Sequence, residues 1–242
     1  MISQNIDLFY LESRTESIHC VIVMPSETVE NYLKSILILS MENDRGEVSM
    51  GQIASTLGVT PGTATSMMKN LQKEKWLSYK ARKGVTLTPS GKKIGMRMIR
   101  RHRLLETFLV ETLGLDWSEI HDEAEVLEHA ISEKVLERLN IFLGKPQHDP
   151  HGHPIPTKGG VIRNLPGKTL LKSPLGKKLK IESILDQSPE FLTFAQAKGL
   201  MPGRIIKLIK NEKVADTIEL QVEKNPKFSL GYKTAEKILV TG

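Results

Sequence analysis

Polar and apolar residues in the middle of the chain, from Ser118 as the expected helix cap to about Leu143, follow the 3.6-residue period of an α-helix. One stripe of this helix is apolar and is expected to face the core; it contains Ile120, Ala124, Leu127 and Ile131. The neighbouring stripe carries imidazoles and carboxylates at positions i, i+4, i+7 and i+8, namely His121, Glu125, Glu128 and His129. Because neighbouring carboxylates repel each other, a divalent metal ion would explain this face. A solvated acidic surface is the alternative.

A second long helix is predicted immediately before this one. It runs from Thr88 to about Leu113, with Ser90 as its expected cap, and it carries His102 and Glu106 one turn apart on one face. These two side chains are candidates for further metal ligands, although such pairs are also common on helix surfaces. Both helices have apolar positions to spare, which indicates a dimer interface.

The residues before these helices have the spacing of a helix-turn-helix. A short amphipathic helix capped by Ser49 covers residues 48–57, a tight turn covers 58–60, and a second helix starts at Thr60 and Pro61 and ends near residue 75. Residues 76–87 follow as two strands around a basic turn, the wing of a winged helix. The second helix and the wing present the residues predicted to contact DNA, which are Thr60, Gly62, Thr63, Thr65, Ser66, Lys69, Arg82 and Lys83.

Charge is divided unevenly along a chain whose net charge is +6. Residues 60–103 contain twelve Lys or Arg and one acid, whereas residues 104–140 contain ten Asp or Glu and two bases. A basic block alone is often only a solvated surface, but here it coincides with the helix-turn-helix, which favours DNA binding.

The C-terminal third changes character. Residues 146–167 are rich in proline and are interpreted as a linker, and the histidines within it, His148, His151 and His153, are expected to lack the fixed geometry of a metal site. Beyond the linker, short strands are predicted at residues 169–171, 180–185, 204–209, 218–222 and 237–240, with a helical turn at 191–199. A small β-barrel over residues 168–242 fits this pattern.

Several functional classes are excluded by composition. No apolar run approaches the ~20 residues of a membrane span, and no secretory signal is recognisable, so we expect a cytoplasmic protein without a membrane partner. Cys20 is the only cysteine and lies outside every candidate site. Any metal is therefore expected on oxygen and nitrogen ligands.

Three separated motifs now resemble one family. RHRLLE at residues 101–106, HDEAEVLEH at 121–129 and GHPIP at 152–156, in this order after a winged helix, are similar to the diphtheria toxin repressor family of iron- and manganese-dependent transcriptional regulators. KGLMPG at 198–203 resembles the SH3-like domain of longer members. The resemblance implies an α+β multi-domain fold: a winged helix-turn-helix at 24–93, a helical metal-binding and dimerisation domain at 94–145, the linker at 146–167 and an SH3-like barrel at 168–242.

The resemblance also implies two adjacent metal sites. The first would use Glu125, Glu128 and His129, with Asn31 as a further candidate, and the second would use His102, Glu106 and His121. A residue matching Glu190, or alternatively Gln187, would reach the second site from the SH3-like domain. Iron-type members have Cys at position 125 and Met at position 31, whereas manganese-type members have Glu at 125, Asp at 31 and Glu at 34. Glu125 therefore indicates manganese, while Asn31 and Lys34 depart from the manganese pattern.

These observations predict a homodimeric repressor, activated by Mn(II) or alternatively Fe(II), that binds a palindromic DNA operator, controls metal-homeostasis genes and has no small-molecule substrate. A metallohydrolase using the same His and Glu residues is an alternative, but no HExxH motif or separate nucleophile accompanies the cluster. A metal-independent winged-helix protein is another. Residues 1–23 match none of this, and translation is hypothesised to start at Met24. The alternative is a genuine extension in which residues 18–23 add an edge strand or cover the dimer.

Overall fold

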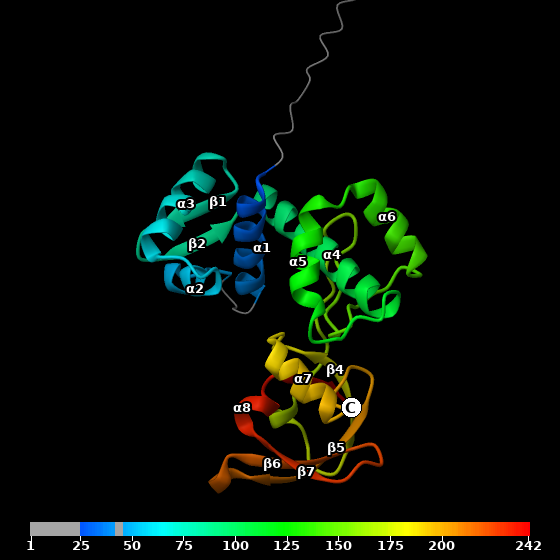
Figure 1. Ribbon diagram of the computed structural model, residues 1–242. Helices are drawn as coiled ribbons and strands as arrows, with labels where there is room; N and C mark the ends of the chain where they lie inside the picture. Colours follow the sequence, from blue (N-terminus) through cyan, green and yellow to red (C-terminus); the bar gives the residue numbers. More distant parts are fainter. Residues whose placement is uncertain (1–24, 42–45) are drawn as a thin grey trace, which may run out of the picture.

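The protein is described by a computed structural model that covers residues 25–41 and 46–242. The hypothesis about residues 1–23 lies outside the described residues. Figure 1 shows a winged helix, a helical middle part and a separate β-rich C-terminal part, the α+β arrangement that the sequence predicted. No helix among the described residues is long and apolar enough to cross a membrane.

The winged helix consists of α1 (Glu27–Met41), α2 (Met50–Thr56), α3 (Pro61–Lys73), β1 (Leu77–Lys80) and β2 (Gly84–Leu87). Its helix caps are those that the sequence predicted. Ser49 forms a capping box with Gln52, and the Thr60 side chain accepts a hydrogen bond from the Thr63 amide ahead of Pro61. The inner face of α3, with Ala64, Met68 and Leu71, is buried against α1 and the two strands. Helix α3 is thereby fixed with its opposite face outward.

The helical part contains α4 (Pro89–Glu111), α5 (Ile120–Ala130) and α6 (Glu133–Phe142). Two sequence predictions are corrected here. The cap of α4 is Thr88, whose side chain accepts from the Gly91 amide, while Ser90 lies inside the helix. The single helix predicted to end near residue 143 is two helices, because Ile131 adopts an extended backbone and Ser132 caps α6 through the Val135 amide.

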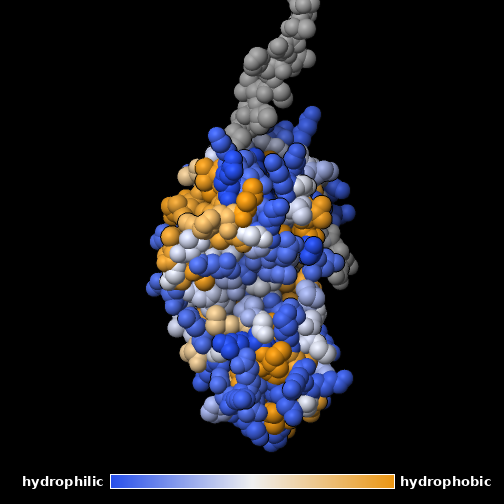
Figure 2. Space-filling view, turned by 90° about the vertical axis from the view of Figure 1, so that its right-hand side faces the viewer, coloured by the Kyte–Doolittle hydropathy of each residue, from blue (hydrophilic) through white to orange (hydrophobic). Residues whose placement is uncertain are grey.

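The apolar stripe predicted on α5 is only partly buried. Ile120 and Ala124 face the core, but Leu127 is 39% exposed and the carboxylate residue Glu128 is fully buried in its place. The exposed apolar side chains of α5 and α6 are Val126, Leu127, Val135, Ile141 and Phe142. Figure 2 views the side on which α6 lies in Figure 1, and apolar side chains gather on its upper part. Uncovered apolar surface of this kind is typical of an interface between subunits.

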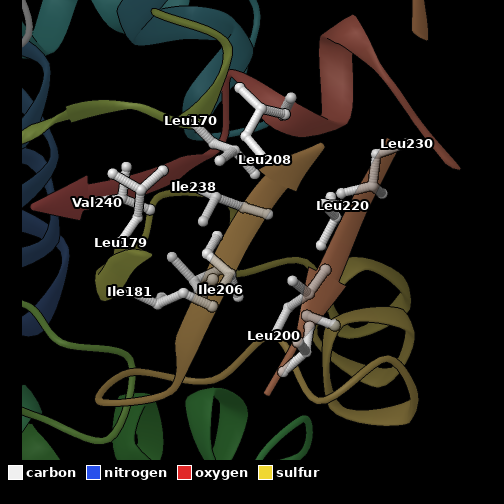
Figure 3. Close-up of a cluster of buried hydrophobic side chains, with 14 of the residues drawn as sticks. Leu170, Leu179, Ile181, Leu200, Ile206, Leu208, Leu220, Leu230, Ile238 and Val240 are labelled. Atoms are coloured by element: carbon white, nitrogen blue, oxygen red, sulfur yellow. The ribbon is translucent and has the colours of Figure 1, made fainter. Parts of the chain in front are cut away.

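The C-terminal part is an antiparallel six-stranded sheet with strand order β3-β8-β4-β5-β6-β7. The strands are β3 (Lys168–Thr169), β4 (Lys178–Ile184), β5 (Ile205–Glu212), β6 (Thr217–Val222), β7 (Phe228–Gly231) and β8 (Ile238–Thr241), with helices α7 (Pro189–Ala197) and α8 (Tyr232–Ala235). Alternating apolar residues of these strands point inward to one core (Figure 3). Strand β7 was not predicted from the sequence. It has only four residues and follows a turn that contains Lys224, Asn225 and Pro226.

The segment predicted as a linker lacks regular helices and strands, but its first part is not a loose connection. Asp149, His151 and His153 are buried, and the Ile184 amide donates to the His151 carbonyl. Trp117, from the turn before α5, belongs to the apolar core of the C-terminal part, and its indole donates to the Pro150 carbonyl. These contacts hold the C-terminal domain against the helical domain.

Candidate metal centre

Helices α1 and α5 bring the first predicted set of ligands together. The carboxylates of Glu125 and Glu128 lie with the His102 imidazole in one group whose candidate ligand atoms are all within 4.8 Å of each other. His129 Nε2 lies 3.6 Å from Glu128 Oε1 and 2.9 Å from Asn31 Oδ1. Asn31 belongs to α1, so this group joins the DNA-binding domain to the dimerisation helices.

A carboxylate on α1 orients His129. Glu30 Oε2 lies 2.9 Å from His129 Nδ1, and Glu30 Oε1 accepts from Arg97 at 3.0 Å. A carboxylate can only accept, so Nδ1 donates to Glu30, and Nε2 is the ring nitrogen that faces Asn31 Oδ1 and Glu128. Metal-binding histidines commonly have a carboxylate on one ring nitrogen in this way, while the other nitrogen binds the metal. The sequence analysis had not singled out Glu30, although its position beside Asn31 was visible.

The second predicted group forms around His102, which lies between the two groups. Its Nε2 is 3.0 Å from Glu106 Oε1 and 3.1 Å from His121 Nδ1, while its Nδ1 is 2.7 Å from Glu128 Oε2. Burial alone would lower the pKa of His102, but the carboxylates of Glu106 and Glu128 outweigh it and raise that pKa to about 9. Without a metal, His102 is therefore an imidazolium ion that both carboxylates stabilise.

Glu106 shows that this group suits a cation. Its carboxylate is completely buried, and its Oε2 has no hydrogen-bond partner among the described residues. A buried carboxylate oxygen without a partner is unfavourable unless an ion or a water molecule satisfies it. Burial raises the pKa of Glu106, but His102, His121 and His151 lower it well below its ordinary value, so the group is an anion. Imidazole nitrogen and carboxylate oxygen fit Mn(II) and Fe(II).

Three residues of a neighbouring loop, Asp149, His151 and His153, were not assigned to a metal site from sequence. His151 Nδ1 lies 3.9 Å from Glu106 Oε1, and its Nε2 donates to the Trp117 carbonyl at 3.2 Å, which leaves Nδ1 to accept from the side-chain amide of Gln187 at 3.2 Å. Asp149, His151 and His153 form a further group with the spacing of metal ligands. The expectation that these histidines lack fixed geometry is wrong, because the loop is buried by β4 and Trp117. The GHPIP motif was the available signal.

The C-terminal domain reaches this region through Gln187. The Gln187 side-chain nitrogen lies 3.2 Å from His151 Nδ1 and 3.4 Å from His153 Nδ1. Glu190, the first-named candidate, is exposed at the start of α7. The less favoured of the two sequence candidates is thus the one beside the histidines.

The predicted DNA-contacting residues lie on one outer surface of the winged helix. Thr60, Gly62, Thr63, Ser66, Lys69, Arg82 and Lys83 are exposed, and Thr65 is half-buried. Arg82 has a positive φ of 66° in the turn between β1 and β2, which forms the tip of the wing. The side-chain oxygen of Thr65 donates to the Pro61 carbonyl, so it is less free to contact a base than the Ser66 hydroxyl.

Family models account for nearly all of the described chain. Residues 24–85 match the "Iron dependent repressor, N-terminal DNA binding domain", residues 88–157 match the "Iron dependent repressor, metal binding and dimerisation domain", and residues 168–242 match the FeoA domain. The second match extends through the buried histidines of the predicted linker.

Related proteins and solved structures agree with these models. The transcriptional regulator MntR of Geobacillus thermodenitrificans is 36% identical over 126 residues, which is 52% of this chain and 87% of the relative. A helix-turn-helix regulator of Methanocaldococcus jannaschii is 37% identical over 120 residues, which is 50% of this chain and 95% of the relative. Among structures, a manganese-dependent transcriptional repressor in complex with manganese superimposes with a TM-score of 0.80 at 34% identity, covering 88% of this chain and 98% of the other. ScaR with bound Cd²⁺ has a TM-score of 0.76 at 32% identity, covering 90% and 99%.

Proposed function

Because the chain belongs to the diphtheria toxin repressor family of metal-dependent transcriptional regulators, we propose that it is a repressor activated by Mn(II), which acts on a palindromic operator and controls genes of metal homeostasis. Members of this family are DNA-binding homodimers and not enzymes, which removes the metallohydrolase alternative. The observation that carries the proposal is the 2.9 Å contact between Asn31 of the DNA-binding domain and His129 of the dimerisation domain. We place its action in the cytoplasm.

The geometry supports a mechanism in which the metal site sets the position of the winged helix. Asn31 on α1 would share an ion with Glu125, Glu128 and His129 on α5, and Glu30 holds the His129 ring in place. The ion would supply positive charge and fixed coordination directions. Helix α1 shares one apolar core with α3 and contacts α2 and β2 directly. A shift of α1 toward α5 would therefore move the recognition helix, and in a dimer it would change the spacing of two recognition helices.

The donor set favours Mn(II) with Fe(II) as the alternative. Glu125 offers a hard carboxylate and no cysteine is available among these groups, which suits Mn(II). Asn31 offers a neutral amide oxygen, so the site has one anionic donor fewer than the manganese-type pattern. The relative solved with manganese is similar over almost its whole length, which supports the same preference.

Titrating operator binding with Mn(II), and anaerobically with Fe(II), tests the proposal. We expect Mn(II) to promote binding, and we expect Asn31→Asp to reduce the Mn(II) concentration required on the order of tenfold, because it adds an anionic donor beside His129. Fluorescence anisotropy of labelled operator DNA gives both midpoints. Thr28→Asp, at an exposed position of the same helix, is the control for added charge alone. A wild type that responds only to Fe(II), or an Asp variant no more sensitive than the control, contradicts the manganese assignment.

Replacing Lys69, Arg82 or Lys83 with Ala is expected to weaken binding to all DNA sequences alike. Each exposed side chain that contacts a phosphate should reduce the slope of log affinity against log salt by about one. Anisotropy titrations at several salt concentrations, with operator and unrelated DNA, measure this slope. Lys213→Ala, an equally exposed lysine in the C-terminal domain, should leave it unchanged. Equal slopes for all four variants and the wild type would show that the recognition surface is misassigned.

A further inference from the structure

A lysine occupies the centre of the group formed by His102, Glu125 and Glu128. Lys34 lies on α1 and is only 6% exposed. Its Nζ lies 2.5 Å from Glu125 Oε1, 2.8 and 2.9 Å from the two carboxylate oxygens of Glu128, and 3.4 Å from His102 Nδ1. These four atoms are the ones that would otherwise surround a cation.

Positive charge already occupies this part of the site. The Lys34 ammonium forms ion pairs with the carboxylates of Glu125 and Glu128, at 2.5 and 2.8 Å. A divalent ion at the same place would lie against an ammonium group in a partly dry interior, where repulsion between like charges is strong.

The surroundings of His129 Nε2, which Glu128 also faces, differ from those of Lys34. His129 Nε2 and Asn31 Oδ1 lie 2.9 Å apart there, and Glu128 Oε1 is 3.6 Å from His129 Nε2. No lysine or arginine nitrogen is among the groups within hydrogen-bond distance of His129 Nε2 in the described part of the chain. An ion on this side could share Glu128 with Lys34 without displacing it.

We propose that the Lys34 ammonium takes the place of a second metal ion, so that the group of Glu125, Glu128 and His129 binds one divalent cation beside His129 and not a pair of ions. The inference rests on the proposed metal site at Glu125, Glu128 and His129. Lys34 also ties α1 to α5 through Glu125 and Glu128 when no metal is bound. The DNA-binding domain therefore stays attached to the dimerisation helices at this point in the metal-free protein.

Counting bound Mn(II) tests the proposal. The full chain is dialysed to equilibrium against Mn(II) and the metal per chain is measured by elemental analysis, with electron paramagnetic resonance to detect exchange-coupled ion pairs. For the wild type we expect no coupled-pair signal. Lys34→Glu replaces the ammonium with a carboxylate and is expected to bind one more Mn(II) per chain, with a coupled-pair signal. Lys34→Arg, which keeps the charge, should match the wild type, and Lys69→Glu on the exposed face of α3 controls for the change in net charge.

Lys34→Gln provides a second test if the Lys34→Glu variant does not fold. It removes the charge while keeping a side chain of similar length, and it too should admit an additional ion, at weaker affinity. A coupled pair in the wild type would overturn the proposal, and so would folded Glu and Gln variants that bind no more Mn(II) than the wild type. A wild type that binds no Mn(II) or Fe(II) at all would instead refute the proposed metal-dependent function.

Discussion

Glu128→Gln is expected to abolish metal-stimulated DNA binding at ordinary Mn(II) concentrations. The Mn(II) concentration needed for half-maximal operator binding should rise by roughly 100-fold or more, because replacing even a residue that only hydrogen-bonds to a metal ligand changes metal affinity by about 10- to 100-fold. Glu128 is completely buried and faces His102 and His129 at once. The substitution removes an anionic donor from the middle of the site. An amide of the same size can still accept a hydrogen bond from Lys34, so the fold should persist.

Anisotropy of labelled operator during a Mn(II) titration measures this loss, and a thermal melt followed by circular dichroism checks the fold. Glu123→Gln makes the same chemical change on the exposed side of the same helix and should behave like the wild type. His129→Ala should lose the metal response to a similar degree, because it removes the donor nitrogen of the site. The fold should persist, since Glu30 retains Arg97 as its partner. If the Glu128 and His129 variants respond to Mn(II) as the wild type does, the site on α5 is not the activating one.

Gly152→Ala is expected to lower the free energy of unfolding of the C-terminal domain, together with its docked loop, by about 2–5 kcal/mol. Gly152 has a φ of +88°, and a Cβ there would lie 2.0 Å from the carbonyl oxygen of Glu182. That oxygen belongs to the backbone of β4, between the paired residues Ile181 and Ser183, so the contact is relieved only if the strand backbone or the loop moves. The loop carrying His151 and His153 should therefore detach from β4.

Differential scanning calorimetry and hydrogen exchange of residues 148–155 measure this effect. Gly144→Ala is the matched control, because Gly144 has a similar φ of +73° but open space where the Cβ would lie. The control experiences only the strain of a left-handed residue, about 1 kcal/mol. Equal destabilisation by both substitutions would mean that the close contact between the loop and β4 is not formed in solution.

Local patterns in the sequence determined the parts of this protein that depend on neighbouring residues. Ser49 and Thr60 begin their helices because a side-chain oxygen satisfies an amide two or three residues later, and that interaction needs no distant partner. Helical periodicity likewise placed Glu125, Glu128 and His129 on one side of α5. The same rules would have identified Thr88 and Ser132 as caps, since Thr88 precedes a proline as Thr60 does.

Tertiary packing decided which of these side chains are buried and what lies opposite them. Periodicity assigned Leu127 to the core, yet Glu128 is buried, because α1 and α4 bring Lys34 and His102 against it. A run of prolines and histidines suggested a flexible linker, but β4 and Trp117 cover it and fix His151 beside Glu106. These contacts join residues from 26 to 94 positions apart in the sequence, at distances along the chain over which no local pattern constrains geometry. Only the packing of the three domains determines which charges meet.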